Sequence, residues 1–281
     1  MKLVTFIHQG KQSVGIITDR YLYPLPFKSM NQLIDSDTSF ETMAAMAGNP
    51  IALQEVEILS PIPEPKQDII CLGINFMEHA AESARYKKEA FGGDRPYAVY
   101  FSKRVNEAVP HNGTISRYSK IVDSLDYECE LGVVIGRTCR NVSKEDAFKY
   151  IFGYTIINDI SARNLQTCHK QWYFGKSLDG FTPMGPAIVT EDEFERPPIL
   201  QLRSYVNGEL RQDSTTDLFI FDIPHVISEL SSGMTLKPGT IISMGTPAGV
   251  GMGFRPPKFL KHGDVVECFI ENIGTLRTYI D

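Results

Sequence analysis

Short stretches of alternating apolar and polar residues dominate the chain and predict more strands than helices. Three prolines within residues 60–65 remove backbone donors and favour extended geometry, which interrupts regular structure. We therefore predict a small N-terminal domain over residues 1–65 and a larger domain over residues 66–281. The elements predicted before the prolines are strands over 2–7, 13–18 and 21–25 and a helix over 30–46.

The larger domain is predicted to mix strands and helices without regular alternation. Because the strands outnumber the helices, a doubly wound parallel sheet is not expected, and the fold class is a strand-rich mixed α/β fold. Asn207 and Gly208 predict a tight turn after one of the strands. The predicted elements are strands over 68–72, 98–101, 127–135, 152–158 and 202–206 and helices over 75–91, 144–150 and 223–230.

Composition narrows the function classes. The chain has 281 residues, 42% of them hydrophobic, and a net charge of -6, which argues against a nucleic-acid-binding surface. No uncharged stretch is long and apolar enough to span a bilayer. The five cysteines are scattered without Cys-x-x-Cys spacing, so reduced thiols are expected rather than disulfides or a zinc site. These features predict a cytoplasmic protein without a nucleic-acid or membrane partner.

Glu128 and Glu130 lie two residues apart in a predicted strand. Alternate residues of a strand point to the same side, so the two carboxylates are expected side by side. Such charges repel each other unless water or a cation neutralises them, and Asp159 can supply a third oxygen ligand. The alternative is a solvated strand face, but the concentration of polar residues over 158–166 favours a site.

His79 and Glu82 lie three residues apart on one face of a predicted helix. This spacing lets the carboxylate orient the imidazole, which can then activate a water molecule. The alternative is a weak contact on the surface of a helix. The pair therefore predicts acid–base chemistry only in combination with other groups.

Two glycine-containing loops offer further candidates. Lys176 lies in the loop 175–186, where its ammonium could neutralise an oxyanion, or could simply be exposed. The loop 245–253 lacks the Gly-Lys-Ser/Thr ending of a phosphate loop, so a nucleotide site is not expected. Its backbone amides and the Thr246 hydroxyl could instead bind a carboxylate, unless it only connects strands.

Taken together, these segments resemble the fumarylacetoacetate hydrolase family from about Asp68 to the C-terminus. Each motif is weak alone, and their occurrence in the family's order is specific. The matching motifs are Gly73-x-Asn75-Phe76-x-x-His79-x-x-Glu82, Tyr127-Glu128-x-Glu130-Leu131, Asn158-Asp159-x-Ser161-Ala162-Arg163, Gly175-Lys176-Ser177-x-Asp179 and Gly245-Thr246-Pro247-x-Gly249-Val250-Gly251.

The resemblance implies a β-roll with a small N-terminal domain, a homodimer and a role for each matched residue. It implies a small 2-oxo acid as substrate and a hard divalent cation, Mg²⁺ or Mn²⁺, on oxygen ligands. The implied residues are Glu128, Glu130 and Asp159 for the metal, His79, Glu82 and Lys176 for catalysis, and Arg163, Gln166, Thr246, Asn75 and Lys103 for substrate binding.

Three positions depart from the family's pattern. Phe76 stands where tyrosine is frequent, Asn164 where aspartate is frequent, and Arg104 follows Lys103 where proline is common. None of these changes removes a predicted metal ligand. They leave the identity of the substrate open.

Hydrolysis of a carbon–carbon bond in an acylpyruvate-like acid is the leading hypothesis, because His79 and Glu82 are both present. The metal would stabilise the departing enolate, and the dyad would activate the attacking water. The alternatives are isomerisation of a 2-hydroxymuconate-type diacid, or decarboxylation of oxaloacetate, at the same site. A non-catalytic sensor of 2-oxo acids is a further possibility from a different class.

Overall fold

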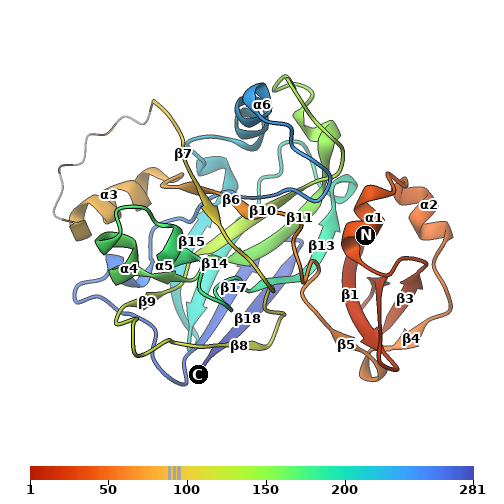
Figure 1. The fold of residues 1–281 in the computed structure, drawn as a ribbon, viewed down its shortest axis with the longest axis horizontal. Coiled ribbons are helices and arrows are strands. Elements are labelled where there is room, and N and C mark those ends of the chain that lie inside the picture. Colours follow the sequence, from red (N-terminus) through yellow and green to blue (C-terminus); the bar gives the residue numbers. More distant parts are fainter. Residues whose placement is uncertain (88–89, 91–92, 94–95) are drawn as a thin grey trace.

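A large mixed sheet runs through the molecule, whose computed structural model describes residues 1–87, 90, 93 and 96–281 (Figure 1). The strands of this sheet are β1 (Lys2–His8), β2 (Lys11–Ile17), β3 (Tyr21–Leu25), β4 (Ile51–Ala52), β5 (Glu57–Ile58), β6 (Ile69–Gly73), β7 (Val99–Lys103), β10 (Cys129–Ile135), β11 (Ile151–Asn158), β13 (Met184–Thr190) and β16 (Ile241–Ser243). Their order is β4-β3-β2-β1-β13-β11-β10-β16-β6-β7, and β5 pairs with β1. The prediction of a strand-rich mixed α/β fold is confirmed.

A second sheet packs against the first and closes the main core. It contains, in order, β15 (Glu209–Thr215), β14 (Gln201–Val206), β17 (Val265–Ile270), β18 (Gly274–Ile280) and β8 (Gly113–Ile115). Buried residues of both sheets, such as Leu131 and Leu276, belong to one hydrophobic cluster. Asn207 and Gly208 both have positive φ, 52° and 80°, as the predicted turn between β14 and β15 requires.

The N-terminal strands extend the large sheet, because β1 pairs antiparallel with β13 through Leu3 and Ile188. The single helix predicted over 30–46 is wrong. The segment forms α1 (Met30–Asp35) and α2 (Phe40–Ala45), and a serine caps the start of each. Asp37, with φ of 49°, lies in the break between them. The domain boundary at residue 65 stays a prediction.

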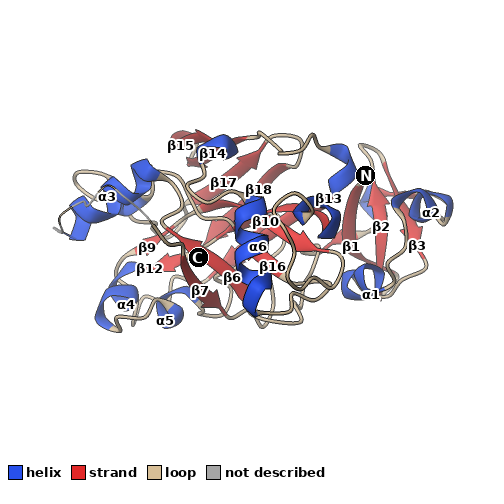
Figure 2. Cartoon of the chain, turned by 90° about the horizontal axis from the view of Figure 1, so that it is seen from above, coloured by secondary structure: helices blue, strands red, loops and turns tan. Residues whose placement is uncertain are grey.

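The remaining helices lie around the sheets (Figure 2). The helix predicted over 75–91 is described as α3 over Met77–Lys87, and residues 88, 89 and 91 of that prediction lie outside the described residues. The helix predicted over 144–150 is wrong, because only a short 3₁₀ turn, η2 (Ala147–Tyr150), forms there. The other helical elements are α4 (Arg163–Cys168), α5 (Tyr173–Lys176), α6 (Ile223–Gly233), η1 (Leu53–Glu55), η3 (Glu191–Glu193), η4 (Thr216–Leu218) and η5 (Gly251–Gly253).

Two more short strands complete the part of the fold that carries the site. They are β9 (Leu125–Asp126) and β12 (Ser161–Ala162), which pair with each other. β9 precedes β10, and β12 follows β11. The pair therefore brings together the two chain segments that carry the acidic residues.

Candidate metal and active site

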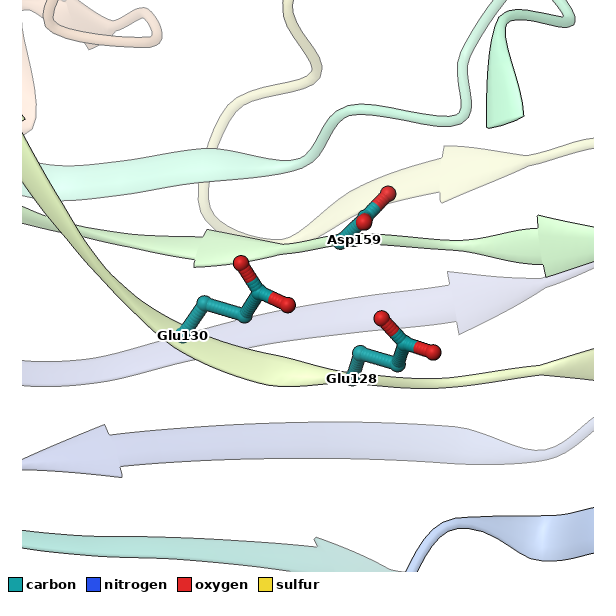
Figure 3. A group of neighbouring side chains, drawn as sticks. All are labelled: Glu128, Glu130 and Asp159. Atoms are coloured by element: carbon teal, nitrogen blue, oxygen red, sulfur yellow. The ribbon is translucent and has the colours of Figure 1, made fainter. Parts of the chain in front are cut away.

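The three acids predicted as metal ligands converge in the structure (Figure 3). Glu128 immediately precedes β10, Glu130 lies within it, and Asp159 immediately follows β11. The antiparallel register pairs Cys129 with Asn158, so the N-terminal end of β10 meets the C-terminal end of β11. All three side chains are buried, and one carboxylate oxygen of each lies within 4.8 Å of the others.

Basic side chains neutralise two of these acids. The Lys176 ammonium donates to Glu128 Oε2 at 2.7 Å and to Asp159 Oδ2 at 2.6 Å. Burial raises the pKa of the Glu128 carboxyl, but Lys176 and Arg163 outweigh burial and hold that pKa below its ordinary value. Burial lowers the pKa of Lys176, but Asp159 and Glu128 outweigh it and raise that pKa overall. Lys176 is therefore a cation and not a base.

Glu130 has no basic partner within ion-pair distance among the residues described. Its Oε2 accepts hydrogen bonds from Ser243 Oγ at 2.5 Å and from the Gly245 N–H at 3.1 Å. Burial raises the pKa of the Glu130 carboxyl well above its ordinary value, and the charges of Asp159 and Glu128 raise it further. An ionised Glu130 therefore requires an additional positive charge nearby.

A divalent cation fits this arrangement. In the described part of the chain, four buried carboxylates lie near three buried cations. Ionisation of all four, Glu130 included, therefore leaves one negative charge in excess. The donors are all oxygens, which hard cations prefer. The carboxylates are Asp126, Glu128, Glu130 and Asp159, and the cations are Lys103, Arg163 and Lys176.

Metal addition is expected to stabilise the folded protein. A cation that binds only the folded state at a concentration 100 times its Kd adds about 2.7 kcal/mol to the free energy of unfolding. The measurement is urea denaturation with increasing Mn²⁺ or Mg²⁺, and EDTA should reverse the effect. An unchanged midpoint at millimolar metal would contradict a metal site at these residues.

His79 and Glu82 form the predicted dyad on α3. His79 Nδ1 lies 3.1 Å from Glu82 Oε2, and both side chains are buried. If Nδ1 donates to the carboxylate, Nε2 keeps its lone pair and can act as a base. Glu82 Oε1 in turn accepts a hydrogen bond from the Gly249 N–H at 3.0 Å. The structure therefore joins the dyad to the glycine loop 245–253.

His79 of the dyad and Glu128 and Glu130 of the three acids line one cavity of about 620 Å³, whereas Glu82 and Asp159 do not line it. Its size lies within the range typical of small-molecule sites. Trp172, Tyr86 and Phe101 line one part of it, and Lys87 and Lys170 lie beside them. The cavity brings together seven of the residues predicted from the sequence: His79, Glu128, Glu130, Arg163, Gln166, Lys176 and Thr246.

Asn75 and Lys103, which were predicted to contact the substrate, do not line this cavity. Lys103 Nζ donates to Asp159 Oδ1, Ile160 O and Lys176 O, which uses all three of its hydrogens. The Asn75 side chain bonds to main-chain atoms of Phe221 and Met244. Both residues hold the framework of the site instead.

The Thr246 hydroxyl lines the cavity but already has two protein partners. It donates to Cys129 O at 3.0 Å and accepts from Gln212 Nε2 at 2.7 Å. Gln212 also donates to Pro247 O and accepts from the Cys129 N–H, so it fastens the glycine loop to β10. A substrate carboxylate can take the Thr246 proton only in place of Cys129 O.

Sequence reasoning missed Asp126, Gln212 and Ser243 as parts of the site, and it named Asn158 only within a motif. Asn158 Oδ1 accepts from the Glu128 N–H, and Ser243 donates to Glu130. Asp126 could have been found, because it continues the alternation of Glu128 and Glu130 by one step toward the N-terminus. No comparable signal points to Gln212, which lies far away in the sequence.

Most of the chain matches one known protein family. The family described as "Fumarylacetoacetate (FAA) hydrolase C-terminal" matches residues 68–281. Oxaloacetate tautomerase YisK of Bacillus subtilis (strain 168) is 46% identical over 229 residues, which are 82% of this chain and 74% of that protein. In the described part of this chain, no helix is long and apolar enough to cross a membrane.

Two solved structures extend the similarity to the whole chain. A fumarylacetoacetate hydrolase from psychrophilic Exiguobacterium antarcticum has a TM-score of 0.87 and 37% identity, covering 100% of this chain and 99% of that one. A 5-carboxymethyl-2-hydroxymuconate delta-isomerase from Mycobacterium smegmatis has a TM-score of 0.79 and 30% identity, with the same coverage. The resemblance inferred from the motifs is thereby confirmed, and the chain belongs to the fumarylacetoacetate hydrolase family.

Proposed function

We propose that this chain is a divalent-metal-dependent enzyme that interconverts the keto and enol forms of a small 2-oxo acid such as oxaloacetate. The observation that carries the proposal is that His79 lines the same cavity as Glu128 and Glu130, so a base faces the proposed metal site. The 46% identity to an oxaloacetate tautomerase supports this reaction over the hydrolysis ranked first from the sequence. Mg²⁺ and Mn²⁺ are the proposed metals, on Glu128, Glu130 and Asp159.

The basic residues of the cavity are suited to a dianionic acid. Arg163 and Lys176 present their cationic groups to the cavity, and Gln166 lies beside Arg163, with its Oε1 3.1 Å from Arg163 Nη1. These groups would bind the substrate carboxylate and orient the 2-oxo group. A bound Mg²⁺ or Mn²⁺ would supply Lewis-acid polarisation of that oxo group.

His79 would carry the proton. Its Nε2 would remove a proton from C3 of the keto acid, while Glu82 holds Nδ1 and stabilises the imidazolium. The C3–H electron pair would form the C2–C3 double bond, and the negative charge would move to the 2-oxygen. Lys176 would stabilise that oxygen as an ammonium. The imidazolium would then return its proton to the oxygen, which completes the enol.

Hydrolysis of an acylpyruvate is the second candidate, because the same dyad could deprotonate a water molecule. A cavity of about 620 Å³ has room for an acid longer than four carbons and for that water. One similar structure is named a fumarylacetoacetate hydrolase. Isomerisation of a hydroxymuconate diacid proceeds through the same enolate. Decarboxylation requires no base, so it would not use His79 and Glu82.

A substrate panel with matched chelator controls tests these candidates. We expect the purified protein with Mg²⁺ to accelerate decay of the enol absorbance of oxaloacetate above the buffer rate, and EDTA to abolish the acceleration. Acylpyruvates and hydroxymuconates are assayed in parallel by mass spectrometry. Pyruvate release from an acylpyruvate without enol turnover would replace tautomerisation by hydrolysis. Binding of 2-oxo acids without any turnover would indicate a sensor.

Two further predictions accompany the proposal. The family resemblance implies a homodimer, which light scattering coupled to size-exclusion chromatography can test. A cytoplasmic location is also proposed, and fractionation of cells can test it.

A further inference from the structure

We propose that Asp126 is a positioning residue that holds Arg163 and the glycine loop 249–253 in one fixed arrangement. It would thereby align the group that binds the substrate carboxylate with the dyad that moves the proton. The roles of Arg163 and the dyad rest on the proposed function. The position of Asp126 itself follows from contacts within the chain.

Asp126 is fully buried, and both of its carboxylate oxygens are saturated with donors. Oδ1 accepts from the Gly251 N–H at 2.6 Å and from the Tyr127 N–H at 2.9 Å. Oδ2 accepts from the Met252 N–H at 3.0 Å and from Arg163 Nε at 2.9 Å. A single carboxylate thus joins the glycine loop to the guanidinium. It has no lone pair left for a metal or substrate, which distinguishes it from Glu130.

Arg163 is held on two sides, and one of its donor groups has no partner among the described residues. Its Nε bonds to Asp126, and its Nη1 lies 2.6 Å from Glu128 Oε1. Nη2 is buried, and no partner for it occurs in the described part of the chain. Because the guanidinium is planar, fixing Nε and Nη1 also fixes the direction of the Nη2 hydrogens. The two buried acids therefore decide where Arg163 presents its remaining donors.

The same loop touches the dyad on its other side. The Gly249 N–H donates to Glu82 Oε1 at 3.0 Å. A Cβ at Gly253 would lie 1.7 Å from that oxygen, and a Cβ at Gly251 would lie 2.6 Å from Asp126 Oδ1. The loop is therefore packed tightly between the two carboxylates. A shift of Asp126 would reach Arg163 directly and Glu82 through the loop.

Asp126→Asn keeps the size of the side chain but removes its charge and half of its acceptor capacity. The amide group would place hydrogens against donors on one side, either the loop amides or Arg163 Nε. Hydrogen bonds to charged groups contribute about 1.5–3 kcal/mol, which corresponds to about 10–100-fold in an equilibrium constant. We therefore expect oxalate, an unreactive analogue of a 2-oxo acid enolate, to bind about 10–100-fold more weakly in the presence of Mg²⁺.

A double-mutant cycle shows whether Asp126 acts through Arg163. Oxalate affinity is measured by calorimetry with saturating Mg²⁺ for wild type, Asp126→Asn, Arg163→Gln and the double variant. Positioning through Arg163 predicts that Asp126→Asn changes affinity little once Arg163 is replaced. Fully additive losses would overturn the proposal, as would wild-type oxalate affinity in Asp126→Asn. The affinity for Mn²⁺ alone is measured separately and should change less than the affinity for oxalate.

Glu191→Gln is the matched control, because Glu191 is also a buried carboxylate paired with an arginine, Arg196, away from the cavity. Glu191→Gln should lower stability without changing oxalate affinity, kcat or KM. If Asp126→Asn does not fold, Asp126→Glu carries the test, because it keeps the charge and moves the carboxylate by one methylene group. Wild-type oxalate affinity in Asp126→Glu would then reject the proposal.

The outcomes separate this inference from the proposed function. Coupled loss of oxalate binding, with no turnover of any acid by wild type, would support the inference and reject the enzyme activity. Turnover of oxaloacetate with additive or absent effects at Asp126 would do the reverse. A wild-type protein that does not bind oxalate at all would count against both.

Discussion

Replacing His79 by alanine is expected to lower kcat for enol–keto conversion by about 10²–10⁴-fold, the usual contribution of a positioned acid–base group. His79 is buried, lines the same cavity as Glu128 and Glu130, and has Glu82 on Nδ1, so Nε2 is left to act as the base. His79 is not one of the three proposed metal ligands, Glu128, Glu130 and Asp159. KM and the affinity for Mn²⁺ should therefore change much less than kcat.

Stopped-flow measurement of enol absorbance with saturating Mg²⁺ tests this expectation. His225→Ala is the matched control, because His225 also pairs with a glutamate on its own helix, Glu229, four residues further on and with its Oε2 3.4 Å from His225 Nε2, but outside the cavity. It should retain wild-type kcat. Glu82→Gln keeps one side-chain oxygen, which can accept from either His79 Nδ1 or the Gly249 N–H. A smaller loss of kcat than in His79→Ala is therefore expected. A His79→Ala protein with wild-type kcat would remove the dyad from the mechanism and leave the metal site as the only catalyst.

Local patterns in the sequence were sufficient to predict that the three proposed metal ligands lie close together. Glu128 and Glu130 share one side of the chain because their spacing is two, and Asp159 follows an apolar stretch that became β11. The antiparallel register of β10 and β11 then brings the three together. His79 and Glu82 were predictable for a similar reason, since a separation of three along a helix already places two side chains in contact.

Features that depend on tertiary contacts were not predictable in this way. Lys103 carries a charge that suggests a ligand contact, but only the folded chain shows that Asp159 and two carbonyls use all its hydrogens. Gln212 reaches the glycine loop because β15 passes beside it. The interruption between α1 and α2 depends on a residue with positive φ, Asp37, which the apolar pattern does not report.

Converting Asp159 to asparagine is expected to destabilise the metal-free protein far more than the same change at Glu130. Asp159 bonds to both Lys103 and Lys176, which are buried. Asp159→Asn therefore leaves Lys103 without a carboxylate partner among the described residues and leaves Lys176 with Glu128 alone. Breaking a buried ion pair in this way costs about 3–5 kcal/mol. Glu130 has no cation partner among the described residues, and glutamine can still accept from Ser243 and Gly245. Glu130→Gln should therefore not lower stability in EDTA.

The pH dependence of stability should distinguish the two variants further. Burial raises the pKa of Glu130 in the folded chain, so the folded state holds a proton that the unfolded state has released. In EDTA, the stabilisation from the proton on Glu130 is fully present below the ordinary carboxyl pKa. It is lost as the pH rises toward the raised pKa of Glu130. Glu130→Gln cannot titrate there and should show a flatter profile, which urea denaturation at several pH values measures.

Both variants should lose metal-dependent stabilisation and turnover, because each removes one of three oxygen ligands. Equal destabilisation by Asp159→Asn and Glu130→Gln in EDTA would contradict this charge distribution. In it, Asp159 is paired with Lys103 and Lys176, and Glu130 has no cation partner among the described residues.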